Sequence, residues 1–180
     1  MTDSDTRLIQ RAKSGDRRAF GKLVKKNQER ILFLAYDLVG DQEEAKDLAQ
    51  ESFIRAFEKL PLFEERSQFS TWLYRITVNL AKDYHRRKNR RSIESLDESM
   101  QIADPATFSP DSQDPLEGNS ISEHLEEALD KLSIKQRTAT VLRYFHQKSS
   151  REIAEIMGCA ESTARIHVFR GVANLKKILA

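Results

Sequence analysis

The sequence predicts an all-α protein in which two small helical domains, residues 1–91 and 121–180, are joined by a flexible acidic linker, residues 92–120. Apolar side chains recur with the 3.6-residue period of a helix along most of the chain, and helix-capping residues stand where these periods begin and end. The middle run has three prolines, many Ser and Asp residues and no basic residue. Such a run has too little apolar surface to offset its ordering entropy, which is typical of a linker.

The first domain is expected to hold three long helices. Asp16 caps the first of these, over about 17–39, and Gly40 ends it. Asp41 starts the second helix with a capping-box pattern. After a short polar loop the third helix begins near Ser67 and ends in the basic run KDYHRRKNRR.

The second domain is expected to hold four shorter helices. Residues 121–132 form an amphipathic pattern, and Ser133 and Ser149 each begin a capping box for the helix that follows. Gly158 supplies the left-handed conformation that often ends a helix, and a last helix begins near Glu161.

The last two helices have the spacing of a C-terminal helix-turn-helix. Ala154, four positions before Gly158, is small enough to let the helices approach closely. The last helix has an apolar stripe for the core, which leaves an outward stripe of polar side chains without a carboxylate: Thr163, His167, Arg170, Asn174 and Lys177. Long donors of this kind suit phosphates and base edges. The alternative is a helical hairpin whose polar stripe is only solvated.

The net charge of +2 is unevenly distributed. Residues 1–91 carry 20 basic and 14 acidic side chains, residues 92–120 carry none and seven, and residues 121–180 carry ten and seven. Six cations fall within ten positions of the first domain: Lys82, Arg86, Arg87, Lys88, Arg90 and Arg91. Such density favours a nucleic-acid partner whose binding weakens with salt, and a solvated helix face is the alternative.

Aromatic residues stand just before this run. Phe69, near the start of the third helix, is the better candidate to stack on an unpaired base. Trp72 and Tyr74 flank Leu73 and fit the core of the domain.

Other functions find little support in the sequence. Cys159 is the single cysteine, which excludes an internal disulfide and a thiolate zinc cluster, and we expect it to be a small buried side chain. We find no catalytic constellation, glycine-rich phosphate loop or metal-spaced cluster, so we expect no enzyme activity, metal or cofactor. No apolar run is long enough to cross a bilayer and the N-terminus is polar, which predicts a cytoplasmic protein without membrane insertion.

The motifs DLAQESFIRAF (residues 47–57) and FSTWLYRITVN (residues 69–79), followed by the helix-turn-helix, resemble the extracytoplasmic-function sigma factors of the bacterial sigma-70 family. The resemblance covers nearly the whole chain and implies core RNA polymerase as the partner of the helix over 42–59. The polymerase contacts that it implies are Asp47, Gln50, Glu51 and Arg55. The family's habit suggests an anti-sigma protein as a further partner.

The resemblance also implies where promoter DNA lies. An extruded base of the −10 element would enter at the start of the third helix, and the basic run would follow the strand. The residues expected to contact the −10 element, here called the −10 set, include arginines of this basic run. They are Ser67, Gln68, Phe69, Ser70, Arg75, Asn79, Asp83, Arg86, Arg87, Arg90 and Arg91. The implied −35 set is Glu161, Ser162, Thr163, Arg165, His167 and Arg170. Ile166 and His167 replace a common Ser-Arg pair of the family, so the promoter preference of relatives does not transfer.

The sequence therefore predicts a promoter-specificity subunit that recruits core polymerase and opens the −10 region, while the polymerase performs the chemistry. The main alternative is a free-standing helix-turn-helix regulator, which would bind duplex DNA tightly without polymerase. A recombinase would need a nucleophilic Ser or Tyr in a polar pocket, and all four tyrosines lie within helical patterns.

Overall fold

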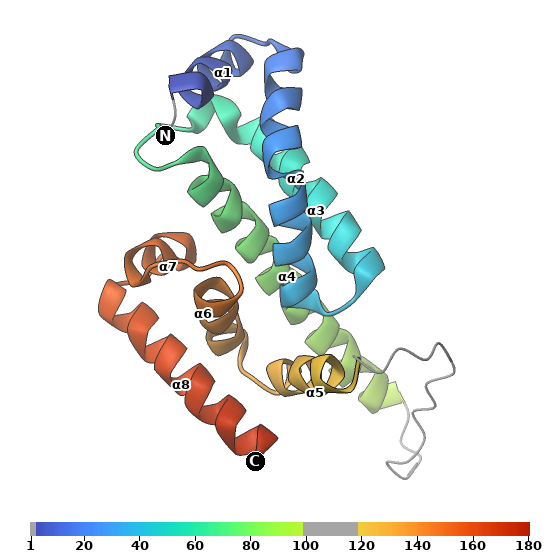
Figure 1. Ribbon diagram of the computed structural model, residues 1–180. Coiled ribbons are helices and arrows are strands. Elements are labelled where there is room, and N and C mark those ends of the chain that lie inside the picture. Colours follow the sequence, from blue (N-terminus) through green and yellow to red (C-terminus); the bar gives the residue numbers. More distant parts are fainter. Residues whose placement is uncertain (1–2, 99–118) are drawn as a thin grey trace.

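The computed structural model describes residues 3–98 and 119–180, with side chains described over 5–90 and 124–180. Every regular element in these ranges is helical: α1 (Asp3–Lys13), α2 (Arg17–Val39), α3 (Gln42–Lys59), the short 3₁₀ turn η1 (Leu60–Leu62), α4 (Phe69–Glu98), α5 (Asn119–Asp130), α6 (Ile134–Tyr144), α7 (Ser150–Met157) and α8 (Glu161–Leu179) (Figure 1). The predicted all-α fold with two helical domains is confirmed.

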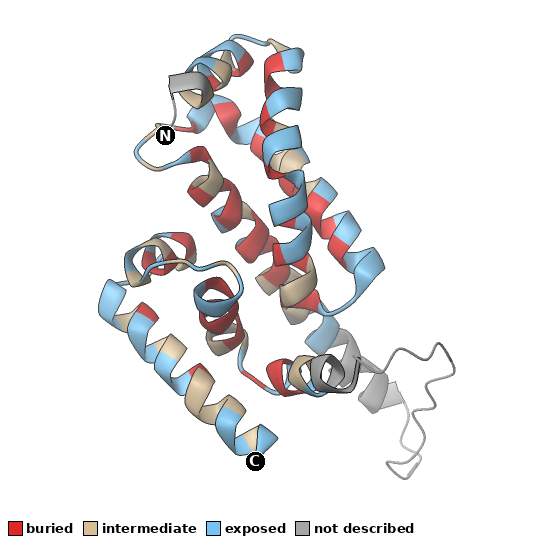
Figure 2. Cartoon of the chain, in the orientation of Figure 1, coloured by how far each residue is buried: buried red, intermediate tan, exposed pale blue. Residues whose placement is uncertain are grey.

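In the first domain, α2, α3 and α4 pack against one another and α1 lies across the beginning of α2 (Figure 1). The facing sides of these helices are buried and their outer sides are exposed (Figure 2). Leu23, Ile31, Leu34 and Leu73 have no more than 1% of their surface exposed. Burying each such side chain stabilises the fold by about 1.5–3 kcal/mol, so this apolar interior holds the three long helices together.

The helix ends follow the predicted capping signals. The Asp16 carboxylate accepts from the backbone N–H groups of residues 18 and 19, at 2.9 and 3.0 Å. Gly40 and Gly158 end their helices in the left-handed region, with φ of 75° and 67°. Ser149 forms the complete capping box with Glu152. These contacts satisfy backbone groups that a helix end leaves without an intrahelical partner.

Two features differ from the sequence prediction. Helix α1 was not predicted, although Leu8, Ile9 and Ala12 give it a short apolar stripe, and Ile9 is fully buried. Helix α4 continues to Glu98 and α5 begins at Asn119, so both ends of the segment predicted as linker are helical. Residues 92–98 contain neither Gly nor Pro, which explains why the helix is not interrupted there. The rest of that segment lies outside the described residues.

The second domain packs α6, α7 and α8 together, with α5 against α8. Leu142, Ile153 and Ile156 are fully buried in its core. Helix α8 approaches α6 closely at Gly171, where an added Cβ would lie 3.1 Å from the carbonyl oxygen of Gln136. The orientation of α8 therefore depends on a residue without a side chain.

Substitution by alanine should change the free energy of unfolding in opposite directions at two glycines in helix interiors. A Cβ on Gly21 would meet no atom within 4 Å, so Gly21→Ala should raise the free energy of unfolding by about 0.5–1 kcal/mol. Gly171→Ala should lower it by about 1–3 kcal/mol, because α8 must shift away from α6. Urea denaturation followed by circular dichroism measures both. A stabilising Gly171→Ala would show that the approach of α8 to α6 is not tight.

Candidate functional site

Helix α3 presents a stripe of side chains on the side away from the core. Asp47, Gln50 and Ile54 are exposed, and Glu51 and Arg55 are partly exposed between them. Their spacing of three and four residues places them on one helix face. Arg55 Nε donates to Glu51 Oε1 at 2.7 Å, which orders the charged part of the stripe. The four residues predicted as polymerase contacts therefore share one surface.

Ile54, which was not among the predicted contacts, is 46% exposed in the middle of this stripe. The available signal was its position, because Ile54 lies outside the apolar period that Ala45, Leu48 and Ala49 follow into the core. Its apolar side chain gives this polar stripe a centre that could be buried against another protein.

A polar cavity of about 290 Å³ lies at the start of α4. Residues of three helices line it: Asp5, Leu23, Lys26, Asn27, Arg30, Gln68, Phe69 and Ser70. The Asn27 side chain is buried and its amide nitrogen donates to the Leu23 carbonyl oxygen at 2.8 Å. Three residues of the predicted −10 set, Gln68, Phe69 and Ser70, thus meet two cations from α2.

The ring of Phe69 is not available for stacking on a base. It is 4% exposed and packs edge-on against Phe63, with the ring centroids 5.9 Å apart. Trp72 lies over the same Phe63 ring at 4.8 Å and is half-buried, and Tyr74 is buried. The prediction that Phe69 offers its ring to a base is wrong here, because Phe63 folds back from the preceding loop and covers that ring.

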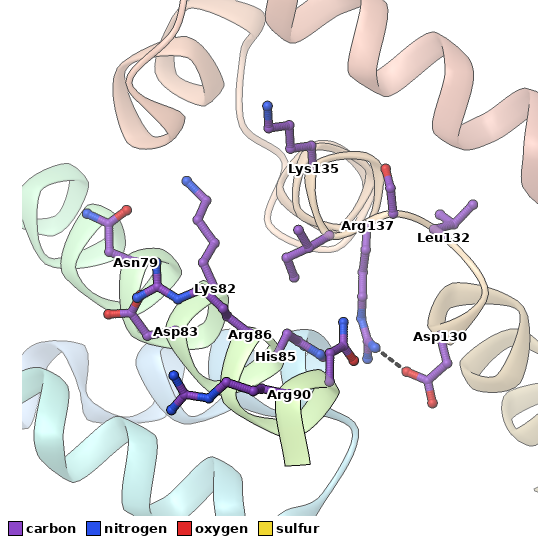
Figure 3. A pocket seen from close by; sticks show the side chains of 13 residues that line it. Asn79, Lys82, Asp83, His85, Arg86, Arg90, Asp130, Leu132, Lys135 and Arg137 are labelled. Atoms are coloured by element: carbon purple, nitrogen blue, oxygen red, sulfur yellow. Dashed lines mark hydrogen bonds and ion pairs between the residues drawn. The ribbon is translucent and has the colours of Figure 1, made fainter. Parts of the chain in front are cut away.

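The basic face of α4 forms one wall of a cleft, and the second domain forms the other (Figure 3). From α4, the cleft is lined by Asn79, Lys82, Asp83, His85, Arg86, Asn89 and Arg90. From the second domain, it is lined by Asp130, Leu132, Ser133, Ile134, Lys135 and Arg137. Most of the −10 set beyond the start of α4 therefore faces this cleft.

Of the members of the −10 set beyond the start of α4, three lie outside the cleft or outside the description. The Arg75 guanidinium lies beside Gly158 in the turn of the helix-turn-helix. Arg87 is exposed but does not line the cleft, and the side chain of Arg91 lies outside the described residues.

Positive charge accumulates across the cleft. Burial lowers the pKa of Lys82 below its usual value, and the neighbouring charges of Lys135 and Arg75 lower that pKa further. Arg86 Nη2 bonds Asp83 Oδ1 at 3.1 Å, which neutralises only part of this charge. Cations gathered on this face of α4 and on the facing domain favour an anionic ligand.

The domains meet where α7 lies against α4 and where α6 lies against the C-terminal end of α2. The Arg137 side chain of α6 is 4% exposed, and its Nε donates to the carbonyl oxygen of Asp37 at 3.0 Å. The same guanidinium bonds the carboxylate of Asp130. His146 bridges Tyr74 Oη at 3.1 Å and Asp37 Oδ2 at 3.0 Å. A buried guanidinium at the negative end of a helix dipole stabilises this contact.

Helix α8 is rotated relative to the predicted stripe. Ser162, Arg165, Ile166, Phe169 and Arg170 are exposed, with Phe169 75% exposed. Arg165 Nη2 bonds Glu161 Oε1, also exposed, at 2.7 Å.

Three residues predicted to face outward are instead half-buried: Thr163, His167 and Asn174. The Asn174 amide donates to Gln136 Oε1 of α6 at 3.0 Å, and burial lowers the pKa of His167, as do Lys135 and Arg170. These three side chains are less exposed than predicted, because Ala164 and Gly171 bring this side of α8 onto α6. Ile166 and Phe169 take their place on the outer face, and the sequence analysis did not place either in the site.

Among the residues that the structure describes, no helix combines the length and the apolar character that crossing a membrane requires. The same residues contain no group of three or more His, Cys, Asp or Glu side chains that could hold a metal ion.

Comparisons with known proteins match both domains. Residues 23–91 match the family Sigma-70 region 2, and residues 122–175 match Sigma-70, region 4. The RNA polymerase sigma-H factor of Pseudomonas aeruginosa is 35% identical over 98% of this chain and 94% of its own length. The ECF RNA polymerase sigma factor SigW of Bacillus subtilis is also 35% identical, over 95% of this chain and 94% of its own length.

Solved structures give the same result for the fold. RpoE of Bartonella quintana, solved with the anti-sigma factor NepR, matches with a TM-score of 0.65 and 25% identity over 89% of this chain and 96% of its own. CnrH, solved with the cytosolic domain of CnrY, matches in fold with a TM-score of 0.70 and 24% identity, over 98% of this chain and 97% of its own.

The order of the two matched regions and the whole-chain likeness define a two-domain RNA polymerase sigma factor. The chain belongs to the extracytoplasmic-function branch of the sigma-70 family. The alternative of a free-standing helix-turn-helix regulator is not favoured, because the likeness to sigma factors extends over both domains.

Arg137→Ala should loosen the contact between the domains. The substitution removes the donor to the Asp37 carbonyl oxygen, and loss of a buried charged hydrogen bond costs about 1.5–3 kcal/mol. Small-angle X-ray scattering of the free protein should give a larger radius of gyration. Arg143→Ala is the matched control, because Arg143 lies exposed on the same helix. Equal radii for the two variants would show that Arg137 does not hold the domains together.

Proposed function

We propose that this sigma factor contacts core RNA polymerase through the α3 stripe and promoter DNA through α4 and α8. The observation that carries the proposal is the separation of these surfaces. The main packing partners of α3 are α2 and α4, so its outer stripe is accessible while the second domain covers the cleft face of α4. The polymerase can therefore bind before DNA reaches the cleft.

The −10 element of the non-template strand is assigned to the start of α4 and the cleft beyond it. Gln68 and Ser70 offer polar groups to an extruded base, and extrusion costs a few kcal/mol that these contacts must offset. The strand then follows Asn79, Lys82 and Arg86 along α4. Because Lys135 and Arg137 form the opposite wall, the strand can enter only after the domains have moved apart.

The −35 element is assigned to the outer face of α8. Arg165 and Arg170 are exposed there and suit the O6 and N7 acceptors of guanine. Between them Ile166 and Phe169 suit the methyl group of thymine. Glu161 and Ser162 lie at the start of the same helix, where they would be nearest the base edges.

The protein acts in the cytoplasm, where the polymerase is, and supplies no catalytic group of its own. An anti-sigma protein holds it inactive, which the complex of the similar RpoE with the anti-sigma factor NepR supports.

Ile54→Ser should weaken binding to core RNA polymerase at least tenfold, because it removes the apolar centre of the α3 stripe. Titration of labelled protein with purified bacterial core polymerase measures the affinity, and size-exclusion co-elution confirms the complex. Leu62→Ser is the control, because Leu62 is 78% exposed in η1, outside the stripe. Equal affinities for wild type and both variants would contradict the assignment of α3.

Arg170→Ala should weaken holoenzyme binding to double-stranded promoter fragments by about 1–3 kcal/mol and relax selectivity at one −35 position. Fragments selected from a random library by the holoenzyme supply the DNA, and mobility shift measures binding. Lys176→Ala, further along α8, is the control. If Arg170→Ala lowers the free energy of unfolding by as much as it weakens DNA binding, Arg170 has a structural role and is not a DNA contact.

A further inference from the structure

A second basic surface lies between α1 and α2, away from the cleft. The groove there is lined by Arg7, Leu8, Arg11, Lys22, Lys25 and Lys26. Five of its six lining residues are cations and none is acidic. This cluster is not visible in the sequence, because its members come from two helices and approach one another only when α1 folds across α2.

The positive charge of this groove is only partly neutralised. Arg11 pairs with Asp16 at 2.6 Å, and Lys26 pairs with Asp5 at the same distance. Both pairs are partly exposed, and such surface pairs contribute little and give way to a stronger anion. Within the described part of the chain, Lys22 and Lys25 are exposed on the same side of α2 without a carboxylate partner.

The groove and the polar cavity at the start of α4 adjoin one another and share one lining residue. Lys26 lines both, with Lys22 and Lys25 on the groove side and Arg30 on the cavity side. At 1.5 Å per residue, the stretch of α2 from Lys22 to Arg30 is about 12 Å long. A polyanion that occupies the cavity therefore meets further cations as it continues toward α1, and it would replace Asp5 as the partner of Lys26.

We propose that the groove between α1 and α2 binds the sugar-phosphate backbone of single-stranded DNA that continues beyond the base held at the start of α4. This proposal rests on the assignment of that cavity to the −10 strand. The groove offers long flexible cations and one apolar side chain, Leu8, but no set of fixed donors for base edges. Its contacts are therefore independent of sequence and serve to hold the strand after it separates from its complement.

The docking site of the second domain lies at the other end of α2, so the groove is accessible in the free protein (Figure 1). The first experiment therefore uses the full chain without polymerase. Fluorescence anisotropy follows binding of labelled (dT)12 across a salt titration. Lys22→Ala/Lys25→Ala should bind more weakly than wild type, and the slope of log K against log salt should be shallower by about 1.4, for two phosphate contacts.

The matched control is Lys46→Ala/Lys59→Ala, which removes the same charge from the exposed surface of α3. This variant should keep the wild-type slope. Equal slopes for the two double variants would contradict the proposal that the groove binds the DNA strand. Tighter binding of a (dA)12·(dT)12 duplex than of (dT)12 would overturn the choice of a single strand. Displacement of (dT)12 by poly-glutamate at equal charge concentration would contradict DNA as the ligand and indicate an acidic protein instead.

A second arm separates the groove from the −10 assignment. Gln68→Ala alters the cavity alone, and its effect is read as promoter opening by the holoenzyme with permanganate footprinting. If Gln68→Ala opens the promoter normally and only the groove variant loses (dT)12 binding, the groove binds a single strand. Its link to the −10 base is then contradicted. If Gln68→Ala impairs promoter opening while the groove variant binds (dT)12 as wild type does, the −10 assignment stands. The proposal that the groove binds DNA is then contradicted.

Discussion

The placement of the buried Arg137 guanidinium at the C-terminal end of α2 determines how the two domains sit together. Carbonyl groups at a helix end have no intrahelical partner, and here one of them accepts from an arginine of the other domain. Asp130 neutralises the same guanidinium, so the charge is not left without a partner in the interface. Together with the packing of α6 and α7 against α4, this contact forms the cleft that the basic run lines.

The surfaces assigned to function differ in how the domain contact affects them. The α3 stripe and the groove between α1 and α2 belong wholly to the first domain and do not depend on where the second domain lies. The cleft face of α4 is shared, and the recognition face of α8 moves with the second domain. A ligand that separates the domains therefore changes the −10 surface most, because that surface gains access to solvent, while α3 keeps its geometry.

Local signals in the sequence predicted most of the fold. Asp16, Ser149 and Gly158 act through contacts within a few residues, so their effects could be deduced without the tertiary structure. The fate of Phe69 depended on Phe63 folding back, and the rotation of α8 depended on the space beside Gly171. The groove between α1 and α2 requires two helices to meet. These features arise from tertiary packing, which periodicity alone does not specify.

The acceptor of the Arg137 bond is a main-chain oxygen, which has a consequence for how such a chain can vary. Substitutions at position 37 alter the bond between that side chain and His146 but leave the carbonyl oxygen in place. The donor domain thus recognises the shape of a helix terminus more than the identity of its residues. This part of the domain contact therefore tolerates a change of side chain at position 37, whereas the bond from His146 requires an acceptor there.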